Sequence, residues 1–245
     1  MRVLNFLLRN HAKVLLFLII ILGAFFRFYK SYDYFPFEKD QLHDVVFLED
    51  LWKKVKDKKI LPLPLHSDNG ILVALANDGS LVEYITYHGV FSYYFLLPAA
   101  VISNFHPYGL VVFLMSLSTL SIYLMFILGR ELFDEYVGLF AAFLFAILHP
   151  VVLYSRWIWF PSLVPFFVLL SLIAFFKIHS GDKRYWYLFS LATAGVSQIH
   201  NSGNFFLLFM IVMAFVYRLK LPETRVSKFL SLFIFVLIIG PLFIS

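Results

Sequence analysis

The chain has 245 residues, of which 61% are hydrophobic and 14% are charged, and its mean hydropathy is +0.84. Soluble domains carry about 25% charged residues, so this composition excludes a soluble globular protein and indicates a polytopic membrane protein. The chain contains no cysteine, which excludes disulfides, thiolate zinc sites and cysteine nucleophiles. In such a protein the net charge of +5 reports loop topology rather than nucleic-acid binding.

Seven apolar segments are predicted to cross the membrane, because a helix needs about 20 apolar residues to span the hydrocarbon core. They are residues 12–29, 108–128, 137–155, 161–178, 185–200, 202–218 and 228–244. The basic N-terminus precedes the first span, and no small-residue cleavage site follows it. We therefore expect a retained signal anchor with its N-terminus in the cytoplasm.

The positive-inside rule decides whether a further apolar segment, residues 88–104, spans the membrane. If it does not span, the later basic residues all fall in the cytoplasm, and if it does, they all fall outside. These residues are Arg130, Lys177, Lys183, Arg184, Arg218, Lys220, Arg225 and Lys228. We therefore expect residues 88–104 to form a juxtamembrane or re-entrant helix, and residues 30–107 to form one long external loop.

This external loop carries ten of the fifteen acidic residues: Asp33, Glu38, Asp40, Asp44, Glu49, Asp50, Asp57, Asp68, Asp78 and Glu83. Residues 40–59 have apolar side chains at helical spacing and predict an amphipathic helix that ends in lysines. Lysines there would suit anionic lipid head groups. Residues 65–80 contain glycine turns and are predicted to be irregular.

Asp40 is the best candidate for a general base, since it directly follows the first span. Phe35 and Phe37 would raise the pKa of its carboxyl group by excluding water. The alternative is a solvated acid near a helix N-terminus. Asp44 lies one turn further on and would orient a substrate or a metal ion. Glu38 is a weaker candidate of the same kind.

The shorter external loops supply further candidates. Arg156 would hold a lipid phosphate in a bidentate contact or would act as a snorkelling anchor. For Arg27 the anchor interpretation is favoured. His200, beside Gln198, would contact a phosphate or an acceptor, or would make hydrogen bonds between helices. His88 is a further candidate for contact with the substrate.

Trp157 and Trp159 fit an interfacial aromatic belt better than a platform for stacking a sugar.

The order of these features resembles the conserved module of GT-C membrane glycosyltransferases, especially the protein-O-mannosyltransferase-like and aminoarabinose-transferase-like enzymes. The matching stretches are Phe37–Asp44, His88–Tyr94, Gly129–Phe133, Tyr154–Ser162 and Gln198–His200. The resemblance implies an all-α polytopic fold with about seven spans and two juxtamembrane helices in the external loop. Residues 1–245 would form a single GT-C-type domain, and the C-terminal remainder of the family's domain would lie beyond residue 245.

The resemblance also implies transfer of a sugar from a polyprenyl-phosphate donor to a hydroxyl of a protein, lipid or glycan. Transfer would take place on the extracytoplasmic face of the cell membrane, with membrane lipids as the other partners and no nucleic acid. Asp40 and Asp44 would be catalytic, and the substrate would be bound by Glu38, His88, Arg156, Gln198 and His200.

No organic cofactor is implied, and a divalent metal, if one binds, would use Asp40. Asp40-Gln41 stands where many relatives have Asp-Glu, and Trp157–Ser162 contains no acid, so a metal site built from both loops is not expected.

Two functions of another class stay open: a transporter or flippase for lipid-linked saccharides, and an assembly subunit. Transporters commonly place charges at the bilayer midplane, whereas the charges of this chain gather at the membrane surface.

Overall fold

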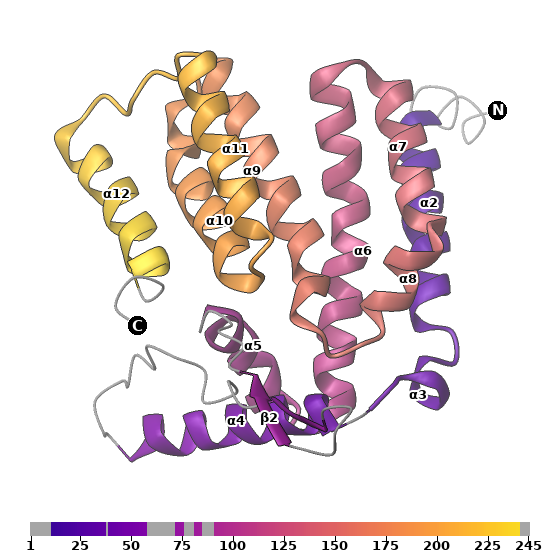
Figure 1. Ribbon diagram of the computed structural model, residues 1–245. Coiled ribbons are helices and arrows are strands. Elements are labelled where there is room, and N and C mark those ends of the chain that lie inside the picture. The colour runs from indigo at the N-terminus through magenta and orange to yellow at the C-terminus, as the bar shows by residue number, and fades with distance from the viewer. Residues whose placement is uncertain (1–10, 38, 58–71, 76–80, 85–90, 241–245) are drawn as a thin grey trace.

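The computed structural model describes residues 11–37, 39–57, 72–75, 81–84 and 91–240, with the backbone alone described at Lys39, Asp40, Lys54 and in both strands. The described chain is predominantly helical (Figure 1). Its helices are α2 (His11–Phe28), α3 (Ser31–Tyr34), α4 (Lys39–Lys56), α5 (Phe91–Ile102), α6 (Pro107–Leu132), α7 (Glu135–Ile147), α8 (His149–Ser155), α9 (Val164–His179), α10 (Trp186–Ile199), α11 (Gly203–Val216) and α12 (Arg225–Ile239), with short 3-10 turns η2 (Phe160–Leu163) and η3 (Lys183–Tyr185).

The bundle consists of two packed groups of helices that meet at α6 and α9. One group contains α2, α6, α7 and α8, and the other contains α9, α10, α11 and α12. Helices α6 and α7 approach closely because glycines face each other: a Cβ atom added at Gly129 would lie 2.7 Å from the Cα of Gly138. Small residues at such a crossing let two membrane helices pack backbone against backbone.

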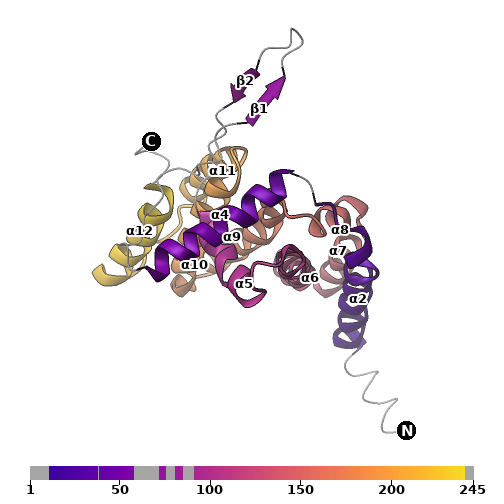
Figure 2. The same cartoon turned by 90° about the horizontal axis from the view of Figure 1, so that it is seen from below.

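Helices α4 and α5 cover one end of this bundle, which we call the outer end (Figures 1 and 2). Leu48 of α4 and Leu96 of α5 are fully buried in one apolar cluster with Leu110 of α6, Phe167 of α9 and Val196 of α10. The α6–α7, α9–α10 and α11–α12 connections lie at the opposite, inner end (Figure 1).

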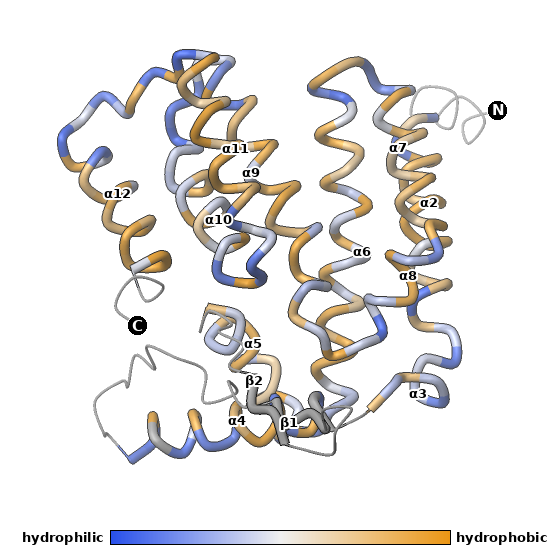
Figure 3. The backbone as a smooth tube through the Cα atoms, in the orientation of Figure 1, coloured by the Kyte–Doolittle hydropathy of each residue, from blue (hydrophilic) through white to orange (hydrophobic). Residues whose placement is uncertain are grey.

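The helices of the bundle are mostly apolar along their middle parts, and polar residues are more frequent toward the two ends (Figure 3). Large apolar side chains such as Phe205, Phe215 and Phe229 are well exposed on α11 and α12. Extended apolar surface of this kind is stable against lipid rather than against water. The protein is therefore a helical membrane protein.

Three described helical segments are long and apolar enough to cross a membrane: His11–Phe28, Pro107–Leu132 and Phe160–His179. The span predicted at 137–155 is interrupted, because α7 and α8 are bent by 56° at the break before Pro150. If this bent pair crosses as a unit, the described spans number four. Helices α10, α11 and α12 have 14, 14 and 15 residues, so the structure does not bear out seven full-length spans.

The amphipathic helix predicted at 40–59 is confirmed as α4. Residues 88–104 also contain a helix, α5, whose 12 residues reach about 18 Å, too short for the roughly 30 Å hydrocarbon core. The prediction of an irregular segment at 65–80 is wrong for residues 72–75, so the fold is not purely α-helical. Strand β1 (Leu72–Leu75) pairs antiparallel with β2 (Leu81–Tyr84), with Leu72 opposite Tyr84. In the sequence, two apolar runs separated by Asn-Asp-Gly are an ordinary hairpin signal.

Candidate functional site

Asp44 is held at the outer end by a buried tyrosine. The hydroxyl group of Tyr93, on α5, donates a hydrogen bond of 2.9 Å to Oδ1 of Asp44, on α4. Tyr93 is fully buried, and its ring packs against those of Phe47 and Phe160. Burial, together with the charge of Asp44 and this hydrogen bond, raises the pKa of Tyr93 above its usual range. Tyr93 therefore stays protonated and fixes one oxygen of the Asp44 carboxylate.

Asp40 lies one turn before Asp44 in the first turn of α4. The N-terminal end of α4 points toward the half of the bundle that holds α8 (Figures 1 and 2). The side chain of Asp40 lies outside the described part of the chain, and so do Glu38 and His88. Their predicted roles stay predictions.

Gln198 on α10 and Ser92 on α5 are buried polar side chains of two helices that pack together. Gln198 is 1% exposed and Ser92 is fully buried, and among the described residues neither side chain has a hydrogen-bond partner. Phe91 packs tightly against Gly195, one turn before Gln198, so the two helices are in direct contact there. Most buried polar groups are hydrogen-bonded, and an unpaired amide therefore marks a position that a ligand or an ordered water can fill.

His200 follows α10 and shapes the turn into α11. Its Nδ1 atom accepts a hydrogen bond of 3.2 Å from the backbone N–H of Ser202 and lies 2.7 Å from the Ser202 hydroxyl oxygen. His200 and Gln198 thus lie together at the end of α10 that faces α5.

Arg156 binds the C-terminal carbonyl groups of α2. Its Nε atom donates to the carbonyl oxygen of Arg27 at 3.0 Å, and its Nη2 atom donates to those of Tyr29, at 3.2 Å, and Phe26. The last carbonyls of a helix have no partner within the helix, so Arg156 caps α2. Within the described residues its Nη1 atom makes no hydrogen bond, which leaves one edge of the guanidinium group for an anion.

Arg27 makes the reverse contact, from α2 to the end of α7. It donates to the carbonyl oxygens of Ala146 at 3.0 Å and Phe145 at 3.3 Å, and to the hydroxyl oxygen of Ser118 at 2.8 Å. Pro150 has no N–H, so the carbonyl group of Ala146 lacks its usual donor four residues on. Arg27 is fully buried, and the favoured interpretation as a snorkelling anchor is therefore wrong.

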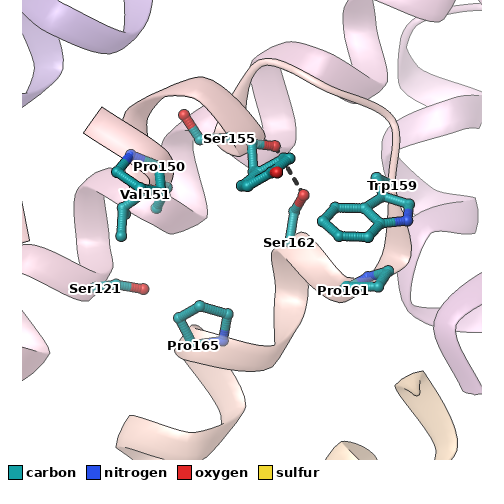
Figure 4. A pocket seen from close by; sticks show the side chains of 10 residues that line it. Ser121, Pro150, Val151, Ser155, Trp159, Pro161, Ser162 and Pro165 are labelled. Atoms are coloured by element: carbon teal, nitrogen blue, oxygen red, sulfur yellow. Dashed lines mark hydrogen bonds between the residues drawn. The ribbon is translucent and has the colours of Figure 1, made fainter. Parts of the chain in front are cut away.

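Beside this contact lies a pocket of about 130 Å³ in the outer half of the bundle (Figure 4). It is lined by Ser118, Ser121, Pro150, Val151, Tyr154, Ser155, Trp159, Pro161, Ser162 and Pro165. The Ser162 hydroxyl donates to the backbone carbonyl of Tyr154 at 2.7 Å, and the Trp159 ring packs against that of Tyr154. Because Ser118 lines the pocket and accepts from Arg27, the pocket is directly connected to the contact between α2 and α7.

The structure thus pairs Asp44 of α4 with Tyr93 of α5. Gln198 and His200 lie at the end of α10, which packs on α5. Arg27 and Arg156 lie where α2 meets α7 and α8, beside the serine-lined pocket. Asp44, Arg156, Gln198 and His200 do not line this pocket.

Sequence reasoning missed Tyr93 and Ser92 as individual site residues, although both lie in the quoted stretch His88–Tyr94. Burial, which the local pattern does not report, distinguishes them from the adjacent Phe91 and Tyr94.

Across the described ranges, no three His, Asp or Glu side chains gather in a way that could hold a metal ion. The chain matches no protein-family model. No curated protein and no solved structure is significantly similar to it.

Proposed function

We propose that this protein is a membrane glycosyltransferase that moves a sugar from a polyprenyl-phosphate donor to an acceptor hydroxyl at the outer end of the bundle. The sequence resemblance to GT-C enzymes motivates the proposal. The observation that carries it is the buried amide of Gln198, which has no hydrogen-bond partner among the described residues. Gln198 lies near the end of α10, which packs on α5, and α5 in turn packs on the helix that bears the candidate carboxylates. Hydroxyl groups of a sugar would supply the missing hydrogen-bond partners.

The proposed reaction needs one base and one anion site. The acceptor oxygen attacks the anomeric carbon, the bond from that carbon to the phosphate oxygen breaks, and Asp40 takes the acceptor's proton. Asp44, held by Tyr93, orients the sugar or a divalent cation if one binds. The uncommitted Nη1 edge of Arg156 binds the leaving polyprenyl phosphate, which carries the developing negative charge. In this scheme Glu38, His88 and His200 line the substrate path.

The proposal includes seven spans with a cytoplasmic N-terminus in the cell membrane. Helices α10, α11 and α12 would then cross with the help of their flanking turns and of local bilayer thinning, as short membrane helices do. The external loop at 30–107 would lie on the membrane surface.

The decisive experiment replaces Asp40 by Asn in the full-length protein. Membranes that contain the protein are supplied with radiolabelled polyprenyl-phosphate hexose and pentose donors, and the transfer of label to acceptors and the release of polyprenyl phosphate are both measured. Asp33→Asn is the matched control, because Asp33 is an exposed acid of the same loop. We expect Asp40→Asn to abolish both signals while it inserts normally, and Asp33→Asn to retain both.

Transfer by Asp40→Asn at the native rate would exclude Asp40 as the base. If the native protein moves intact donor across the membrane without releasing polyprenyl phosphate, it is a flippase. If it does neither, yet assembly of another enzyme depends on it, it is an assembly subunit.

A further inference from the structure

A further candidate binding site lies in the half of the bundle opposite α4 and α5. A groove of about 400 Å³ opens between α11 and α12, both of which pack on α10. It is lined by Trp186, Phe189, Ser190, Thr193, Leu207, Met210, Ile211, Ala214, Leu221, Pro222, Lys228, Ser231, Leu232 and Phe235. Most of the lining is aliphatic or aromatic. Such a surface suits a hydrocarbon chain.

The groove also has a small polar end. Ser231 is 5% exposed, and among the described residues its hydroxyl group has no hydrogen-bond partner. Ser190 is equally buried and faces the same groove from α10. Lys228 lies one turn before Ser231 on α12, so the two residues share one face of this helix, and both line the groove. An ammonium group with nearby hydroxyl donors is suited to a phosphate ester.

The charge of Lys228 is not balanced by the protein in the described ranges. The acids nearest in sequence are already paired: Glu223 with Lys183 at 2.7 Å, and Asp182 with Arg184 at 2.7 Å. The groove is also preformed, because Tyr187 on α10 donates a hydrogen bond of 2.9 Å to Ser227 on α12. The groove therefore has a fixed shape, an apolar body and one uncompensated cation at its end.

We propose that this groove binds one anionic phospholipid from the leaflet at the inner end of the bundle. The lipid phosphate contacts Lys228 and the Ser231 hydroxyl, and one acyl chain lies along Met210 and Ile211 of α11. A free phosphate ion would leave the apolar body of the groove empty. The site is separate from the proposed glycosyl transfer at the outer end and does not depend on it.

Trp186 lines the groove and supplies the measurement. The full-length protein is placed in nanodiscs of phosphatidylcholine that contain a minor fraction of either brominated phosphatidylglycerol or brominated phosphatidylcholine. Bromine atoms on an acyl chain quench a nearby tryptophan, and the difference between the native protein and Trp186→Phe isolates the signal of Trp186. We expect brominated phosphatidylglycerol to quench Trp186 at a lower mole fraction than brominated phosphatidylcholine does.

Lys228→Gln should reduce this preference about fivefold, the ratio expected for one lysine near an anionic membrane surface. Arg225→Gln is the matched control, since Arg225 is an exposed cation of the same helix that does not line the groove. It should keep the native preference. Ser231→Leu, which removes the hydroxyl group and adds volume, should weaken quenching by both lipids.

Equal quenching by the two lipids in the native protein would overturn the proposal, as would equal losses in Lys228→Gln and Arg225→Gln. Displacement of brominated phosphatidylglycerol by inorganic phosphate would show that an anion site, rather than a lipid site, is present. Absence of Trp186 quenching by either lipid would mean that protein fills the groove.

Discussion

The contact between Arg27 and the broken end of α7 allows a sharp test through Pro150. Pro150 removes the N–H that the Ala146 carbonyl would use, and the guanidinium group of Arg27 supplies a substitute at 3.0 Å. Pro150→Ala gives residue 150 an N–H again. Arg27→Met should therefore cost less stability in the Pro150→Ala background than in the native protein.

The magnitude follows from the groups left without partners. Arg27→Met removes the donors to the two carbonyl groups at the end of α7, those of Ala146 and Phe145, and also the contact with the Gly23 carbonyl within α2. Side-chain hydrogen bonds within membranes average about 0.6 kcal/mol, and an unsatisfied buried group costs about 1–3 kcal/mol in proteins generally. We expect Arg27→Met to lower the free energy of unfolding by about 1–3 kcal/mol, less whatever is regained by removing a buried charge. The coupling to Pro150→Ala should be about 1 kcal/mol, because one of the two carbonyls recovers a donor.

The assay is unfolding in mixed micelles titrated with sodium dodecyl sulfate and followed by circular dichroism, for the native protein, both single variants and the double variant. The double-mutant cycle removes the general effect of losing a buried charge, which both backgrounds share. Additive losses would refute the argument, because they would show that Arg27 does not replace the N–H that Pro150 lacks.

Three further outcomes can be measured. Tyr93→Phe should lower the free energy of unfolding by about 1 kcal/mol at neutral pH, because it removes the hydrogen bond to Asp44. The pKa of Tyr93 is raised in the folded state, so the unfolded state loses the tyrosine proton at a lower pH than the folded state does. The native protein should therefore lose stability as the pH rises above about 10, by up to about 1.4 kcal/mol per pH unit. In alkaline unfolding titrations, Tyr93→Phe should lack this part of the decline. Gly138→Ala should lower the free energy of unfolding by about 1–3 kcal/mol in thermal unfolding, since the added Cβ would lie 2.7 Å from a backbone oxygen. The control Gly240→Ala meets no atom within 4 Å and should be neutral. Equal effects of the two substitutions would contradict the close packing of α6 on α7. Gln198→Leu should fold with unchanged or slightly higher stability, because it removes an unpartnered buried amide, yet it should lower kcat/KM for sugar transfer roughly tenfold; unaffected transfer would remove Gln198 from the proposed site.

The local pattern was sufficient for features that depend on neighbouring residues. The apolar spacing over residues 40–59 predicted α4, because helical periodicity is a local property of the chain. Charge bias predicted that residues 88–104 stay at the surface, and α5 is too short to cross the membrane. The bend between α7 and α8 was overlooked, although Pro150 signalled a helix break in the sequence itself.

The sequence by itself determined the membrane class of the protein, its longest helices and the long segment between α2 and α6 that carries most of its acids. Only the tertiary structure decided which polar residues contact one another and which are buried. Arg27 and Arg156 look like similar interfacial cations in the sequence, yet each caps a helix that is more than one hundred residues away from it. The hydrogen bond from Tyr93 to Asp44 and the isolation of Gln198 likewise depend on helix packing across long sequence separations. Local patterns carry no record of these partners, because hydrogen bonding and burial are fixed by which helices meet.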